Sequence, residues 1–212
     1  MSIHTIQQGE HLTRIAVDHG FTHIDPIWDH ADNKALRDKR KNPNVLAPGD
    51  KLFIPERELR TEERPTEQRH KFRLHLRGVR LIVVLLKADH APLANTALVL
   101  EIEGSRRELK TDADGRFIEW IPTHAASGRL KYKETPDAPE TVLDIKIGHL
   151  DPPDIPAGQR ARLANLGYDP GDADNLADLK SAIEEFQLDY ALKVDGVIGP
   201  KTIDALTKAH GC

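Results

Sequence analysis

The sequence predicts a multi-domain α+β protein made of three small modules: an N-terminal βααβ unit, a central all-β sandwich and a C-terminal three-helix bundle. Two observations carry this prediction. The spacing of apolar residues changes along the 212 residues, from a mixed pattern to a period of two and then to about 3.6. Aromatic residues make up only 5% of the chain, whereas Gly and Pro number 14 each, which favours short elements around small cores. We therefore assign residues 1–56, 70–149 and 150–212 to the modules, and 57–69 to a linker.

The N-terminal module reads as strand, helix, helix, strand. Thr5–Gln7 is expected to form the first short strand, and Gly9 the turn that follows it. Apolar residues at 12, 15 and 16 give one helix face, which Gly20 ends. Lys51–Ile54 alternates in polarity and is expected to be the returning strand.

Both ends of this module resemble the LysM family. Residues 9–16 read Gly-Glu-His-Leu-Thr-Arg-Ile-Ala, and residues 44–55 read Asn-Val-Leu-Ala-Pro-Gly-Asp-Lys-Leu-Phe-Ile-Pro. The resemblance implies binding of β-1,4-linked N-acetylglucosamine polymers such as peptidoglycan glycan or chitin, in a groove between the two loops. The matching positions are Gly9, Glu10, His11, Leu12, Asn44, Val45, Leu46, Pro48 and Gly49.

Two features depart from the LysM pattern. His11 stands where the family usually has Thr or Ser, and Trp28–Asn33 is an insertion between the helices. An alternative stays open for the groove itself, because Gly9, Leu12, Pro48 and Gly49 are also residue types that turns and cores require.

The linker at 57–69 carries many charges of both signs and little apolar surface, so it is expected to be solvated. The module that follows, 70–149, alternates apolar and polar residues at Phe72–Leu76, Leu98–Ile102 and Leu143–Ile147, as half-buried strands do. The continuous apolar run Leu81–Leu86 predicts a central strand covered on both faces. About seven short strands are expected, which suits a small sandwich.

The hairpin at Thr111–Phe117 reads Thr-Asp-Ala-Asp-Gly-Arg-Phe. It resembles a hairpin of the prealbumin-like or carboxypeptidase-regulatory sandwich family. This resemblance implies a spacer or a protein-docking module.

The C-terminal module is expected to hold three helices. The first stops at Gly167. The second carries an apolar stripe, is capped by Asp174 or Asn175, and is followed by a third helix with Pro200 in its first turn. The stripe consists of Leu176, Leu179, Ile183, Phe186 and Tyr190.

This module resembles the three-helix peptidoglycan-binding domain family. The marks are Leu-Gly-Tyr at 166–168, Ala-x-x-x-Phe-Gln at 182–187 and Asp-Gly-x-x-Gly-x-x-Thr-x-x-x-Leu at 195–206. The resemblance implies cell-wall binding, and the site residues it suggests are Tyr168, Gln187, Asp195 and Gly196. The loop at 171–176 departs from the family pattern. The alternative is that the motif residues form core and turn rather than a site.

Composition excludes several classes of function. The formal net charge of −4 argues against a nucleic-acid binder, and no apolar run reaches the roughly 18–20 residues needed for membrane insertion. The eleven His residues form no His-Glu-x-x-His motif and are expected to be scattered on the surface, so we expect no metal and no cofactor. The block Ala209–Cys212 resembles a cysteine-containing motif of L,D-transpeptidases. We nevertheless expect no catalytic residue and no enzymatic activity. The one Cys excludes an intrachain disulfide.

Two functions follow from these patterns. The first is a non-catalytic peptidoglycan-binding protein with two wall-binding modules on one chain, a design that raises avidity. The N-terminus shows no secretion signal, so we expect synthesis in the cytoplasm and a non-standard route to the periplasm or outside. The second is an adaptor of a contractile injection or type VI secretion machine, with spike or effector proteins as partners. Residues 29–50 resemble the LysM variety associated with such machines.

Overall fold

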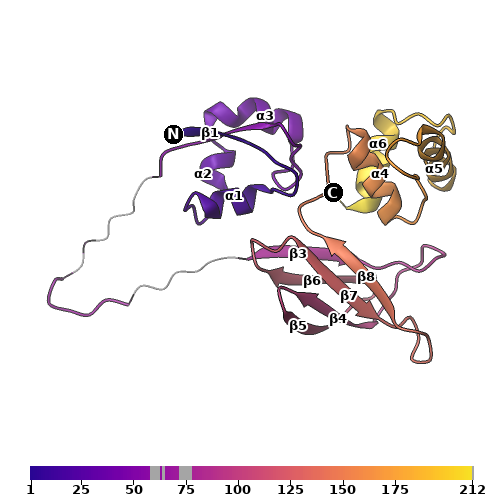
Figure 1. Cartoon of the computed structure of the whole chain (residues 1–212), viewed down its shortest axis with the longest axis horizontal. Coiled ribbons are helices and arrows are strands. Elements are labelled where there is room, and N and C mark those ends of the chain that lie inside the picture. The colour runs from indigo at the N-terminus through magenta and orange to yellow at the C-terminus, as the bar shows by residue number, and fades with distance from the viewer. Residues whose placement is uncertain (58–62, 64, 72–77, 212) are drawn as a thin grey trace.

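The computed structural model describes residues 1–57, 63, 65–71 and 78–211. The predicted mixed α+β class is confirmed: short helices and small sheets alternate along the chain, and helices close its C-terminal region (Figure 1). Buried apolar side chains gather in three separate clusters, one for each third of the fold. The predicted strand at 72–76 and Cys212 lie outside the described residues, as does part of the linker.

The N-terminal part pairs its two ends. Strand β1 (Ser2–Thr5) runs antiparallel to β2 (Lys51–Ile54), with Ser2 opposite Ile54. The strand expected at Thr5–Gln7 lies earlier and shares only Thr5 with β1, because after Ile6 the chain enters a turn closed by the Glu10 N–H on the Gln7 carbonyl.

More helix lies between these strands than the sequence suggested. Helix α1 (Leu12–Asp18) is followed by α2 (Asp25–Trp28), the 3₁₀ turn η1 (Ala31–Asn33) and α3 (Lys34–Arg40). The insertion therefore folds into the module. Buried Asn33 donates to the carbonyls of Ile27 and Phe53 and accepts from the Phe53 N–H at 2.8 Å, which fastens the insertion to β2.

The central part holds two antiparallel sheets. Strand β3 (Val79–Val84) pairs with β6 (Arg116–Ile121), and the second sheet has the order β5-β4-β7-β8. Its strands are β4 (Ala97–Ile102), β5 (Ser105–Lys110), β7 (Ser127–Tyr132) and β8 (Thr141–Lys146). Side chains from both sheets share one core, in which Leu98, Leu100 and Ile102 are buried as their alternation predicted.

The apolar run at 81–86 is not a doubly covered strand. Ile82 and Val84 are 45% and 51% exposed, because β3 belongs to a sheet of two strands whose outer face carries no further layer among the described residues. Leu143 on β8 is likewise 40% exposed. Six strands occur in the described part of 70–149, and the further strand expected at 72–76 lies outside it.

The C-terminal part consists of α4 (Pro156–Asn165), α5 (Leu176–Asp189) and α6 (Pro200–His210). Asn175 caps α5 by accepting hydrogen bonds from the backbone of residues 177 and 178, and Pro200 opens α6, both as expected. The apolar stripe of α5 is shorter than predicted. Leu176 and Tyr190 lie at its two ends and are exposed, so only the middle three positions enter the core.

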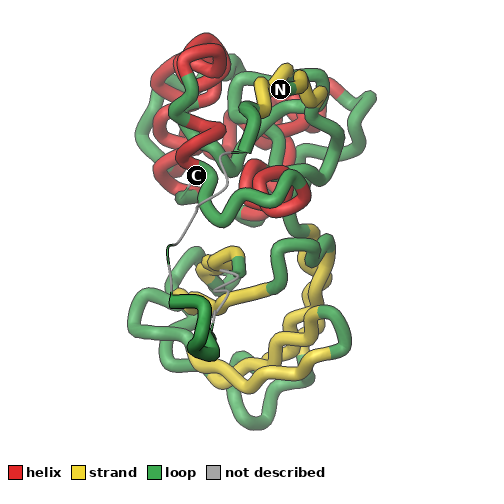
Figure 2. Tube along the Cα trace, turned by 90° about the vertical axis from the view of Figure 1, so that its left-hand side faces the viewer, coloured by secondary structure: helices red, strands yellow, loops and turns green. Residues whose placement is uncertain are grey.

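Both helical parts lie on the same side of the strands (Figures 1 and 2). An ion pair joins the N-terminal part to the C-terminal part: Arg40 Nη1 lies 3.0 Å from Asp154 Oδ1. No helix in the described ranges is long and apolar enough to cross a bilayer.

Candidate functional site

The loops expected to form a glycan groove divide into buried and exposed residues. Leu12, Val45 and Leu46 are buried, so their main contribution is to the packing of the module. Asn44, Pro48 and Gly49 face solvent and remain candidates for ligand contact. The second loop of the expected groove, residues 44–50, lies beside the end of β1, because the Gly49 N–H donates to the Ile6 carbonyl at 2.9 Å.

Glu10 is held by its own loop. Its Oε2 accepts from the Gln7 N–H at 2.9 Å and lies 2.8 Å from the His4 Nε2. Partial burial works to raise the pKa of Glu10, but the hydrogen bonds from His4 and Gln7 outweigh it and lower that pKa below its usual range. The carboxylate thus shapes the turn and has less capacity left for a ligand.

His11 is buried, which corrects the expectation that all histidines are on the surface. Its Nδ1 accepts the Arg14 N–H at 3.3 Å and so caps α1. The ring also hydrogen-bonds the Thr123 backbone in the central part, and burial lowers its pKa. A Ser or Thr could supply the cap but is shorter than this ring. The departure from the LysM pattern at position 11 was the sequence signal for this contact.

The first loop of the expected groove packs against the connection between β8 and α4. A Cβ placed on Gly9 would lie 3.2 Å from the His149 ring, and one on Gly148 would lie 2.7 Å from the Gly9 carbonyl oxygen. The side-chain amide of Gln8 reaches the His149 carbonyl at 3.5 Å. The Gly9–His11 loop is therefore partly covered by the rest of the chain, with His11 buried and Gly9 and Glu10 half-buried.

A buried ion pair stabilises the second loop. The side chains of Arg40 and Asp50 are 4% and 7% exposed, and the guanidinium donates to both carboxylate oxygens at 2.6 and 3.0 Å. Asp50 also accepts the Ala47 N–H at 2.9 Å. Burial alone would raise the pKa of Asp50, but the hydrogen bonds and charge of Arg40 hold it below its usual range.

Three of the four residues suggested for the C-terminal module come together, namely Gln187, Asp195 and Gly196, and their hydrogen bonds hold a turn. Gln187 is fully buried; its amide oxygen accepts from the N–H groups of Asp195 and Gly196, both at 3.0 Å. Its amide nitrogen donates to Asp195 Oδ1 and to the Val197 carbonyl, also at 3.0 Å. The hydrogen bond from the Val197 N–H, with that from Gln187, lowers the pKa of Asp195. These groups hold the turn before α6 and leave Gln187 no free polar atom.

Tyr168 is also part of the packing. It is buried; its hydroxyl donates to Asp189 at 2.9 Å, and its ring meets Phe186 edge-on with centroids 5.7 Å apart. Burial, followed by the Asp189 contact, raises the pKa of Tyr168. On its other side the ring meets His90 of the central part at 5.6 Å.

Exposed apolar side chains of the C-terminal part concentrate between residues 188 and 197. They are Leu188, Tyr190, Val194 and Val197. Val194 and Val197 flank the turn that Gln187 holds, and sequence reasoning did not single them out. The spacing of these apolar residues in the sequence does not distinguish residues exposed on the surface from residues of the core.

The described residues contain no cluster of three or more His, Cys, Asp or Glu side chains able to hold a metal ion. Paired acids such as Glu184 and Glu185 lie on α5, where Glu184 forms an ion pair with Lys180 at 3.5 Å.

Residues 156–206, from the start of α4 to within α6, match the family model of a peptidoglycan binding domain. This match agrees with the resemblance found in the C-terminal sequence and supports cell-wall binding in general. No curated protein and no solved structure matches the chain.

Proposed function

We propose that the chain is a non-catalytic protein that binds the bacterial cell wall, with peptidoglycan as its partner. The observation that carries the proposal is the peptidoglycan-binding match over α4–α6. The exposed apolar residues between 188 and 197 offer this part a contact surface, because they are not buried in its own core.

The N-terminal part is proposed to be a LysM module that adds a second contact with N-acetylglucosamine polymers. The support is the pair of sequence blocks at 9–16 and 44–55, together with the exposure of Asn44, Pro48 and Gly49. Backbone groups of such turns can hydrogen-bond an acetamido group. The central part is proposed to act as a spacer of the prealbumin-like type, or as a docking module.

Co-sedimentation with insoluble peptidoglycan tests the main proposal. The full chain should pellet with purified sacculi at low salt, and soluble N-acetylglucosamine oligomers or stem peptides should compete according to which group is recognised. Recovery of the chain in the supernatant would refute wall binding. Loss of sacculus turbidity, abolished by Cys212→Ala, would instead refute the non-catalytic assignment.

A second candidate function is an adaptor of a contractile injection or type VI secretion machine, in which the LysM-like part docks protein. A specific observation favours it: Gly9 and His11, on the loop expected to face a glycan, already contact residues 148–149 and Thr123. Co-purification with spike or effector proteins under conditions where sacculi are not bound would support this function.

A further inference from the structure

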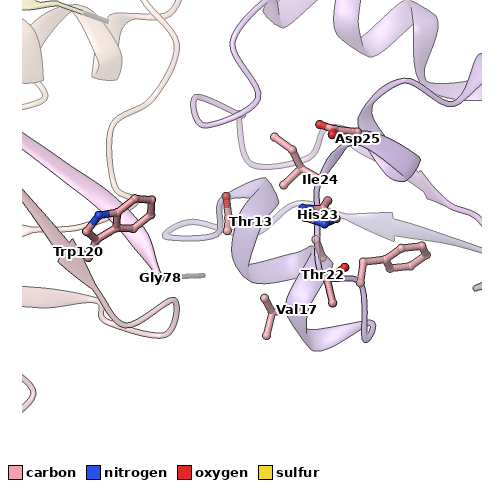
Figure 3. A pocket seen from close by; sticks show the side chains of 10 residues that line it. Thr13, Val17, Thr22, His23, Ile24, Asp25, Gly78 and Trp120 are labelled. Carbon is pink, nitrogen blue, oxygen red and sulfur yellow. The ribbon is translucent and has the colours of Figure 1, made fainter. Parts of the chain in front are cut away.

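A cavity of about 260 Å³ lies between the N-terminal part and the central part (Figure 3). One wall is formed by Trp120 and Gly78 of the central part. The opposite wall comes from α1, the loop that follows it and the start of α2. It contains four polar residues, Thr13, Thr22, His23 and Asp25, and four apolar ones, Ala16, Val17, Phe21 and Ile24. None of the nine positions of the expected LysM groove lines this cavity, so it is a different site.

Trp120 gives the cavity a flat apolar wall. Its side chain is 53% exposed, although Trp is the residue with most to gain from burial. It lies on the outer face of β6, two residues from exposed Ile118, which pairs with exposed Ile82 on β3. The other tryptophan, Trp28, is buried in the N-terminal core. Trp120 is thus an aromatic ring on an apolar strip, across the cavity from the mixed polar and apolar wall of the N-terminal part (Figure 3).

The chemistry of the two walls defines the class of ligand. Among its apolar side chains, the wall opposite Trp120 offers two hydroxyls, an imidazole and a single carboxylate, whereas none of the described lining residues is Lys or Arg. A phosphate or another anion would find no Lys or Arg there and would lie beside the Asp25 carboxylate. A neutral ring with hydroxyls on its edge and C–H groups on its face would satisfy both walls: it can stack on the indole and hydrogen-bond to the side chains opposite.

We propose that this cavity binds a neutral sugar unit of a wall glycan, such as N-acetylglucosamine, stacked on Trp120. The inference rests on the proposed wall-binding function, which would bring glycan to the chain. The volume lies just below the range of about 300–1,000 Å³ that is common for small-molecule pockets, so one or two sugar units fit better than a long segment. The glycan site would then be built from two parts of the chain at once.

The test is a titration of the full chain with tetra-N-acetylglucosamine, followed by tryptophan fluorescence and calorimetry. Binding should shift the Trp120 emission and shield it from acrylamide, while the buried Trp28 contributes little change. Trp120→Ala should weaken tetramer binding about tenfold, since it removes the stacking wall. Thr13→Val, on the opposite wall, should also weaken binding while keeping the fluorescence signal. Val142→Ala, on an exposed position of β8 outside the cavity, should bind normally.

Sacculus co-sedimentation of the same variants separates the two proposals. Trp120→Ala should still pellet through the C-terminal part. If the wild-type chain pellets but its Trp120 emission does not respond to the tetramer, the cavity proposal is wrong and wall binding stands. If a stem peptide, and not the tetramer, shields Trp120, the sugar assignment is overturned. If the tetramer binds at Trp120 but the chain stays in the supernatant, the wall proposal fails and the sugar site stands.

Discussion

Replacing Gln187 by Ala should destabilise the C-terminal part. The Gln187 side chain contacts five polar groups: Asp195 through both its backbone N–H and its carboxylate, the Gly196 N–H, the Val197 carbonyl and the Thr202 hydroxyl. Because an amide nitrogen carries only two hydrogens, its three acceptors share them, and at most four of these contacts are full hydrogen bonds at one time. Alanine removes all of them and leaves a cavity beside α5.

The magnitude follows from the geometry. Each hydrogen bond contributes about 0.5–1.5 kcal/mol net, and a buried group left unpaired costs about 1–3 kcal/mol. The turn at 195–196 is only half-buried, so water can satisfy some of the groups that Gln187 releases. We therefore expect a loss of about 2–4 kcal/mol in the free energy of unfolding of this part. That loss corresponds to amide exchange from the unfolded state about 30- to 1,000-fold faster.

Hydrogen exchange of the full chain, read by mass spectrometry over peptides of α5 and α6, measures this change for the C-terminal part alone. Glu185→Ala is the matched control, because Glu185 is exposed on the same helix and should change the free energy by less than about 0.5 kcal/mol. An acceleration below about tenfold, combined with loss of sacculus binding, would show that Gln187 is a ligand contact. The structural interpretation would then be wrong.

Three further outcomes are expected. Burial, reinforced by the positive charge of the Arg162 guanidinium, lowers the pKa of His210 from 6.5 to about 4. The folded C-terminal part therefore binds fewer protons than the unfolded chain, and its stability should fall as pH drops from about 6.5 towards 4; His210→Gln should flatten this dependence in thermal melts. Asp50→Asn removes the buried counter-charge of Arg40 and leaves it only the exposed Asp154, and it should cost the N-terminal part about 3–5 kcal/mol by hydrogen exchange. Asp154→Asn, at a 53% exposed position, should cost less than about 1 kcal/mol; equal effects would refute the role of burial. Gly148→Ala adds a Cβ 2.7 Å from a backbone oxygen at a φ of +77° and should raise exchange in the N-terminal loop; unchanged exchange would refute that contact.

Local signals in the sequence were the ones that predicted structure well. The Asn175 cap, Pro200 at the start of α6 and the left-handed Gly167 after α4 each depend on a few neighbouring residues. Whether a side chain is buried depends instead on which elements, distant in the sequence, pack together. The run that contains Ile82 and Val84 is apolar enough for a buried strand, but nothing in its own residues tells whether a second layer covers it.

The candidate sites were harder to predict for the same reason. Gln187 belongs to a motif, but the residue type at a motif position can be required by a turn as readily as by a ligand. Its partners at 195–197 are nearby in sequence, but their geometry becomes visible only when α5 and the turn are placed together. His11 was noticed as a departure, yet its partner Thr123 lies more than a hundred residues away. The cavity at Trp120 has walls from two parts and no contiguous motif.

The contacts between parts alter the avidity argument for wall binding. Two modules joined only by a linker gain affinity through an effective concentration set by linker length. Here Arg40 contacts Asp154 at 3.0 Å, and the loop at Gly9 packs against residues 148–149, so these contacts also set the distance between the two parts that we propose to bind the wall. A fixed distance favours glycan strands whose sugar spacing matches it and gives little gain on others. Gly148→Ala should therefore reduce binding to sacculi more than binding to short oligomers, since only the polymer reaches both parts at once. Equal effects on both ligands would show that the N-terminal and C-terminal parts bind independently.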